Sequence, residues 1–253
     1  MAKQIIGSKI IYLDRVSSTN AFMLKEMKEH SFPEGCLVVA HYQYAGRGMD
    51  VNTWESEPGK NLTLSIVLYP GFLPLENQFM LNKVTSLGLY DFANQLPVDD
   101  PVKIKWPNDL YIGDRKAAGI LINNMILGSS IISTVVGIGF NINQEVFFSG
   151  APNPVSLKNV TEMEFSLNRC LTDLCHYLDK RYRDLRLGDF KRLNDDYLHC
   201  QYRSGGYYPF RYKGKRLLAR IETVDDIGRL VVRTSVGDEI CCDQKEIAYI
   251  IES

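Results

Sequence analysis

Residues 102–121 constrain the fold more than any other part of the chain. Apolar residues alternate with lysines over 102–105, which is typical of a strand with one buried face. Pro107 has no N–H for a sheet ladder, so the strand must end there, and Pro-Asn-Asp favours a turn. A second extended run then reaches Gly113-Asp114, a good two-residue hairpin loop, and the chain returns through 116–122.

This loop predicts which side chains share a face of the hairpin. With Gly113-Asp114 as the loop, Tyr111 pairs with Lys116, and Asp109 pairs with Ala118. Side chains alternate, so all four lie on one face, with Asp109 and Lys116 as diagonal neighbours roughly 7–8 Å apart at the backbone. A solvated surface pair would explain the two charges. A binding site would also explain them, because the neighbouring small residues leave room for a ligand.

Length and composition limit the class of protein. A chain of 253 residues allows one large domain, or one large and one small, with a full core. The formal net charge is −1, with acidic and basic residues interleaved, so no clustered basic face for nucleic acid is evident. The apolar runs are too short to span a bilayer and no signal peptide is visible. We therefore expect a cytoplasmic protein that binds neither DNA nor a membrane.

The six cysteines do not indicate a zinc site, because none forms a C-x-x-C pair and the four histidines are scattered. Reduced thiols are expected in the cytoplasm. Spacing alone leaves a catalytic Cys–His pair open.

Two polar segments in the N-terminal half are candidate binding loops. Ser18-Thr19-Asn20 precedes a helix predicted over residues 21–29; one of the three caps the helix, and the others are available to a ligand. The second segment contains Gly46-Arg47-Gly48, which resembles anion-cradling loops. It lacks the third glycine and the following helix of the dinucleotide fingerprint.

The remaining pattern predicts an α+β fold. Helical periodicity covers 75–95, and Thr161-Glu162-Met163-Glu164 predicts a capping box that opens the next helix. A buried strand over 131–142 carries two glycines, which often mark close approach by a ligand. Five short strands after residue 208 predict a small SH3-like β-barrel. We expect domains at 1–203 and 204–253.

Together, these motifs closely resemble those of the biotin–protein ligases over most of residues 10–145. The combination of K-W-P-N-D with K-x-x-G-I-L is the specific part. The matching motifs are Ser18-Thr19-Asn20, Gln43 with Gly46-Arg47-Gly48, Trp54-x-Ser56 with Gly59, Lys105-Trp106-Pro107-Asn108-Asp109, Arg115-Lys116 with Gly119-Ile120-Leu121, and Gly137-x-Gly139-x-Asn141-x-Asn143. The resemblance implies a mixed β-sheet flanked by helices, the class II synthetase-like catalytic fold, followed by the SH3-like β-barrel.

The resemblance also implies a reaction. Biotin and ATP, with Mg²⁺, form biotinyl-5′-AMP, and a lysine of a biotin carboxyl carrier protein then attacks this anhydride. Two anions must meet, so the implied catalytic residues are Lys116, Arg47 and Asp109, with Asp109 also the candidate metal ligand. The implied biotin-binding residues are Ser18, Thr19, Asn20, Gln43, Arg47, Gly48 and Lys116. The implied nucleotide-binding residues are Trp54, Asn108, Asp109 and Asn141.

The chain departs from the family pattern in two places. About nine residues precede the first predicted strand, too few for the N-terminal helix-turn-helix of many bacterial members, so we expect no regulation by direct DNA binding. Met49 stands where the covering loop often carries arginine, and this difference predicts faster escape of biotinyl-AMP. The carrier protein and the formation of a homodimer stay open.

Two alternatives remain. A lipoate– or octanoate–protein ligase shares the fold but has a different glycine-rich signature, which is not found here. A non-catalytic biotin-binding protein would retain the pocket from Ser18 to Gln43 but could lose Lys116, which is present. Transfer of biotin, lipoate or neither to a carrier domain separates the three.

Overall fold

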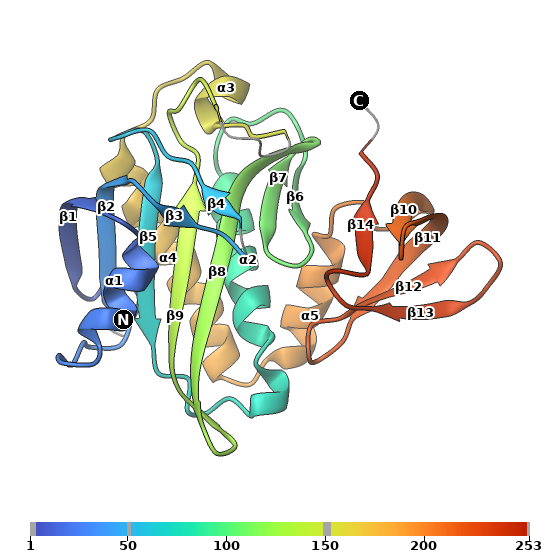
Figure 1. Ribbon diagram of the computed structural model, residues 1–253, viewed down its shortest axis with the longest axis horizontal. Helices are drawn as coiled ribbons and strands as arrows, with labels where there is room; N and C mark the ends of the chain where they lie inside the picture. The colour runs from blue at the N-terminus through green and yellow to red at the C-terminus, as the bar shows by residue number, and fades with distance from the viewer. Residues whose placement is uncertain (1–3, 50–51, 149–152, 252–253) are drawn as a thin grey trace.

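The computed structural model describes residues 4–49, 52–148 and 153–251. Its largest element is a seven-stranded sheet in the order β1-β2-β5-β9-β8-β7-β6 (Figure 1). Strands β1 and β2 are parallel, and the other neighbours are antiparallel. The strands are β1 (Ile10–Val16), β2 (Leu37–Gln43), β5 (Leu62–Leu68), β6 (Val102–Lys105), β7 (Asp109–Ile112), β8 (Arg115–Leu127) and β9 (Ser130–Phe140).

Helices cover both faces of this mixed sheet. On one face, α1 (Thr19–Glu26) is capped by Ser18 and buries Met23 against Val67 and its neighbours. The main core lies on the other face, where three longer helices pack on alternate residues of the strands. These helices are α2 (Met80–Ala93), α4 (Leu167–Arg186) and α5 (Phe190–His199); the short η1 (Leu75–Asn77) and α3 (Leu157–Thr161) lie in connections. This architecture confirms the predicted fold class.

The β7–β8 hairpin departs from the predicted register. Tyr111 pairs with Lys116 as predicted, but Asp109 pairs with Gly119 instead of Ala118. Ala117 is an extra residue in β8, a β-bulge, and a bulge shifts every later residue to the opposite face. Ala118 is therefore buried in the core, and Gly119 shares the face of Asp109. The predicted place of Ala118 is wrong.

The predicted capping box at Thr161 is also wrong. Thr161 ends α3, and Glu162 has a left-handed φ of 58°, which stops the helix. The following helix α4 begins after Ser166, whose hydroxyl caps it. A capping box does occur one helix earlier, between Ser156 and Asn159.

The C-terminal segment forms an antiparallel five-stranded sheet in the order β13-β12-β11-β10-β14. Its strands are β10 (Tyr208–Tyr212), β11 (Lys215–Val224), β12 (Leu230–Thr234), β13 (Glu239–Cys242) and β14 (Ile247–Tyr249). The arrangement agrees with the predicted SH3-like unit. Buried residues of this sheet belong to the same continuous core as those of the seven-stranded sheet. The division between residues 203 and 204 stays a prediction.

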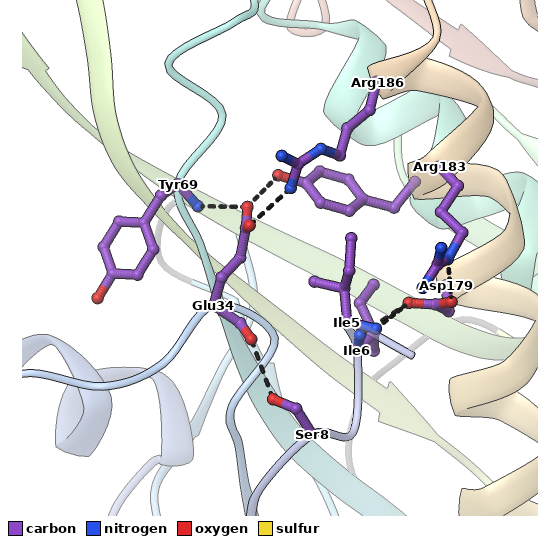
Figure 2. A network of polar contacts seen from close by, with 9 residues as sticks. Ile5, Ile6, Ser8, Glu34, Tyr69, Asp179, Arg183 and Arg186 are labelled. Atoms are coloured by element: carbon purple, nitrogen blue, oxygen red, sulfur yellow. Dashed lines mark hydrogen bonds and ion pairs between the residues drawn. The ribbon is translucent and has the colours of Figure 1, made fainter. Parts of the chain in front are cut away.

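Two carboxylates fasten the N-terminal segment and the loop before β2 to α4 (Figure 2). Asp179 accepts hydrogen bonds from the backbone N–H groups of Ile5 and Ile6, at 2.7 and 2.9 Å. Glu34 accepts a hydrogen bond of 2.7 Å from Arg186. Bonds to charged groups are the stronger ones. The Asp179 bonds therefore hold the segment before β1 against this helix, and the Glu34 bond holds the loop before β2 against it. None of the helices in the described part of the chain is long and apolar enough to span a membrane.

Candidate active site

A cavity of about 680 Å³ opens on the face of the seven-stranded sheet that carries α1. All residues for which the sequence predicts a role in binding or catalysis line this cavity. They are Ser18, Thr19, Asn20, Gln43, Arg47, Gly48, Trp54, Asn108, Asp109, Lys116 and Asn141. The fold therefore brings separated segments to one place, and the role of each residue stays a prediction.

Glycines on two neighbouring strands form the floor of the cavity. Gly119 on β8 pairs with Gly139 on β9, and Gly137 lies on the same face two residues earlier. A Cβ atom at Gly137 would lie 2.6 Å from Nδ2 of Asn20, and one at Gly139 would overlap the indole of Trp54. Glycine is required at these positions because other side chains lie directly on the sheet backbone.

Trp54 covers part of this floor. It lies on β4 (Thr53–Trp54), which pairs with β3 (Gly46–Arg47), so the indole and the Gly-Arg-Gly segment belong to one hairpin. The ammonium of Lys116 lies 5.7 Å from the centre of an indole ring, within the range of a cation–π contact. The indole N–H is buried and donates to no described residue, so a ligand acceptor there would be favourable. A contact of Trp54 with adenine stays a prediction.

Gly139→Ala is expected to displace Trp54 and to slow adenylate formation about fivefold or more, because overpacking a fitted contact costs roughly 1–3 kcal/mol. The chain has two tryptophans. Trp106 is buried elsewhere and donates to Gly228, so a change in fluorescence reports on Trp54. Gly71→Ala is the matched control, since no atom lies within 4 Å of its added Cβ. Unchanged emission and an unchanged rate would contradict the expected displacement.

The start of α1 fixes the hydrogen bonds of Gln43. The backbone N–H of Thr19 donates to Oε1 of Gln43 over 2.6 Å, and the Thr19 hydroxyl donates to the same oxygen over 3.0 Å. Because that hydroxyl proton is used, Thr19 accepts from the hydroxyl of Ser65, 2.9 Å away. Gln43 therefore has its NH₂ group, a donor, available to the cavity, and Thr19 retains one lone pair.

Two buried asparagines each leave an acceptor oxygen unpaired. Nδ2 of Asn20 donates to the carbonyl of Leu121, and Nδ2 of Asn141 donates to that of Val155, both over 3.1 Å. Their Oδ1 atoms are buried and accept no hydrogen bond within the described ranges. An unpaired buried acceptor costs about 1–3 kcal/mol, so both sites favour a ligand with N–H groups.

Lys116 and Asp109 form an ion pair across the β-bulge. Nζ of Lys116 lies 2.6 Å from Oδ1 of Asp109, and their side chains are 27% and 15% exposed. The backbone of Lys116 is held on its other side, since its N–H donates to Asn153 and its carbonyl accepts from Val155. The result is a fixed cation that can exchange its carboxylate partner for an anionic ligand.

Arg47 and Asn108 differ in how firmly they are held. The side chain of Arg47 is exposed at the rim, and its guanidinium forms no hydrogen bond or ion pair with any residue that the structure describes. Nδ2 of Asn108 donates to the carbonyl of Ile120 over 2.5 Å, so this amide joins the turn to β8. The side-chain oxygen and the second N–H of Asn108 remain for a nucleotide.

The predicted role of Asp109 as a metal ligand fits a Mg²⁺ ion that is bound together with ATP, not one held by protein side chains alone. Residues 4–49, 52–148 and 153–251 contain no group of three or more His, Cys, Asp or Glu placed to hold a metal. Mg²⁺ at nucleotide sites is commonly held by one or two carboxylates and the substrate phosphates. Asp109 can supply one such carboxylate if its ion pair with Lys116 opens.

Several cavity residues were not assigned a role from the sequence: Lys105, Tyr111, Gln244 and Lys245. Lys105 opens the K-W-P-N-D motif, which was a usable signal. Gln244 and Lys245 lie in the turn between β13 and β14, and no spacing in the sequence connects that turn with residues far upstream. Ser65, behind Thr19, lies within an apolar run and carried no signal.

Comparisons with known proteins identify similar sequences and a similar fold. The sequence model of the biotin/lipoate A/B protein ligase family matches residues 12–141. The biotin–[acetyl-CoA-carboxylase] ligase of Paracoccus denitrificans is 30% identical over 90% of this chain and 95% of its own length. The bifunctional ligase/repressor BirA of Bacillus subtilis is 30% identical over 92% and 72%.

The solved structure of the biotin protein ligase from Aquifex aeolicus in complex with biotin and ATP shares the fold. Its TM-score is 0.77 at 22% identity, covering 95% of this chain and 98% of that one. Family match, relatives and fold coincide, and the chain belongs to the biotin/lipoate A/B protein ligase family.

Proposed function

We propose that the chain ligates biotin to a specific lysine of a biotin carboxyl carrier protein, using ATP and passing through biotinyl-5′-AMP. The observation that carries the proposal is the arrangement of hydrogen-bonding groups at the start of α1. Gln43 offers a donor, while Thr19 and Asn20 each offer an acceptor. A cyclic urea has one carbonyl between two N–H groups, which is the complementary pattern.

This pattern also distinguishes biotin from lipoate and octanoate. Neither of those acids carries a urea, so binding either would leave the buried groups at Gln43, Thr19 and Asn20 without partners. Each unpaired group costs about 1–3 kcal/mol. Sites built to bond a polar substrate reject analogues that lack the polar group far better than apolar pockets reject an extra methylene.

The first step joins the carboxylate of biotin to the α-phosphate of ATP. Lys116 and Arg47 lie on the same cavity and supply positive charge where the two anions meet. Mg²⁺, when bound with ATP, neutralises phosphate charge. In this step the ammonium of Lys116 breaks its ion pair with Asp109 and binds the biotin carboxylate and the α-phosphate.

In the second step a carrier lysine attacks the carbonyl of biotinyl-5′-AMP, and AMP leaves. Asp109, once separated from Lys116, can hold the incoming amine and accept its proton. The assignment of Asp109 to the amine or to the metal is open. Pairing between copies, cytoplasmic location and the lack of DNA binding stay predictions.

The proposal is tested by supplying ATP with biotin, lipoate or octanoate to the purified protein and a biotin carboxyl carrier domain, followed by mass spectrometry of the domain. We expect a single biotinyl adduct on one lysine and no adduct from the other acids. Transfer of lipoate or octanoate alone would favour the other branch of the family. Biotin binding without any transfer would favour a non-catalytic biotin-binding protein.

Met49 lines the same cavity beside the Gly-Arg-Gly segment. Met49→Arg is expected to slow the release of biotinyl-5′-AMP about tenfold, because a hydrogen bond to a charged group contributes about 1.5–3 kcal/mol. Single-turnover release of labelled adenylate measures this rate. Met163→Arg, at an exposed position away from the cavity lining, is the control. Equal release from wild type and Met49→Arg would rule out a role for this position.

A further inference from the structure

One cation in the cavity is not used by the reaction described above. The ammonium of Lys105 lies between the rings of Tyr111 and Tyr249, 5.0 and 5.2 Å from their centres. It forms no ion pair or hydrogen bond within the described part of the chain. Burial lowers the pKa of Lys105, and nearby Lys116 and Arg203 lower it further, against the opposite effect of Asp109. A partly buried cation that forms no ion pair is a place for an anionic group.

This cation lies at the seam between the two sheets. Lys105 ends β6 of the catalytic sheet, whereas Tyr249 ends β14 of the five-stranded sheet. Figure 1 shows the five-stranded sheet beside the β6–β7 hairpin. The turn that leads into β14 brings Gln244 and Lys245 to the lining of the same cavity. The five-stranded sheet is therefore one wall of the site.

Polar contacts between the two sheets hold this wall in place. The indole N–H of Trp106, next to Lys105 in the chain, donates to the carbonyl of Gly228 over 2.9 Å. Lys83 on α2, only 2% exposed, donates to the carbonyl of Val224 over 3.1 Å. Both acceptors belong to the β11–β12 region of the five-stranded sheet. These contacts fasten the five-stranded sheet, which carries Lys245 in its β13–β14 turn, to α2 and to the residue after Lys105.

We infer that Lys105 and Lys245 form an anion subsite across this seam, which binds the β- and γ-phosphates of ATP and then the released pyrophosphate. The inference rests on the proposed function. When a carboxylate oxygen of biotin bonds to the α-phosphorus, the bond from that phosphorus to the bridging oxygen breaks. The electron pair stays on the oxygen, and the departing pyrophosphate gains a negative charge. Two cations beside it stabilise that charge where it develops.

The test uses Lys105→Gln, Lys245→Gln and the double variant in the full chain, with Lys215→Gln, exposed on β11, as control. We expect each single change to raise KM for ATP about tenfold and to weaken inhibition by pyrophosphate by a similar factor, with about a hundredfold change in the double variant. The Kd for biotin, measured by calorimetry without nucleotide, should stay at the wild-type value. Thermal unfolding of each variant reports on folding separately.

Unchanged KM for ATP and unchanged pyrophosphate inhibition in the double variant would overturn the inference. A rise in KM for the carrier domain alone would also overturn it, because the cations would then serve the protein substrate. An inactive wild-type protein that fails to bind biotin would instead reject the proposed function. The two failures are therefore distinguishable.

Discussion

Lys116→Met should lower the rate of biotinyl-5′-AMP formation by about 10²–10³, the range measured when one group that stabilises transition-state charge is removed. Lys116 is held in the cavity by its backbone contacts and by its 2.6 Å ion pair with Asp109. Methionine retains an unbranched apolar stem of similar length and removes the terminal ammonium group with its charge. Biotin-dependent exchange of pyrophosphate into ATP measures the adenylation step without a carrier.

The same change should also destabilise the fold, because it leaves the carboxylate of Asp109 largely buried and unpaired, at a cost of about 1–3 kcal/mol. Adding Asp109→Asn should restore the free energy of unfolding and leave adenylation impaired. Lys28→Met, at an exposed position beyond α1, is the control for loss of charge. Full exchange activity in Lys116→Met would remove this residue from the mechanism. Recovery of activity in the double variant would show a purely structural role.

Local signals in the sequence predicted the elements of the fold well. Alternation over 102–105, Pro107 and the Gly113-Asp114 loop specify the β6–β7–β8 hairpins through interactions between near neighbours. The five C-terminal strands were predicted for the same reason, since each lies between turn residues. Convergence of the polar motifs could be predicted only from the family resemblance, because nothing local links residues 18–20 with residue 141.

The predicted register of β8 and the predicted start of α4 were wrong, because local sequence signals allowed several positions and long-range packing selected among them. The bulge at Ala117 exists because β8 must pair with β7 and with β9 at once, and no spacing in a single strand reveals that requirement. Helix-start signals occur at Ser156, Thr161 and Ser166, and the left-handed turn at Glu162 selects the first and third. The placing of Lys245 beside the catalytic sheet is a long-range packing result of the same kind.

Gln43→Glu should change the ligand that the pocket prefers from biotin to 2-iminobiotin. In 2-iminobiotin a guanidinium replaces the urea. One carboxylate oxygen would accept from the N–H and hydroxyl of Thr19, as Oε1 does now, and these donors favour the ionised form. The second carboxylate oxygen would stand where the NH₂ group of Gln43 is now, so that an acceptor takes the place of a donor. It would repel the urea oxygen of biotin and attract the N–H groups of protonated 2-iminobiotin.

We expect the Kd for biotin to rise about 10²–10³-fold, because one donor is lost and a charged acceptor faces the carbonyl. Binding of protonated 2-iminobiotin should tighten about tenfold, by the gain of one hydrogen bond between charged groups. Calorimetry with both ligands measures the exchange, and Gln95→Glu, at an exposed position after α2, controls for the added charge. If both ligands weaken equally, Gln43 only shapes the pocket. If neither changes, the donor in the native pocket comes from another residue, because the polarity of Gln43 would then have no effect on the urea.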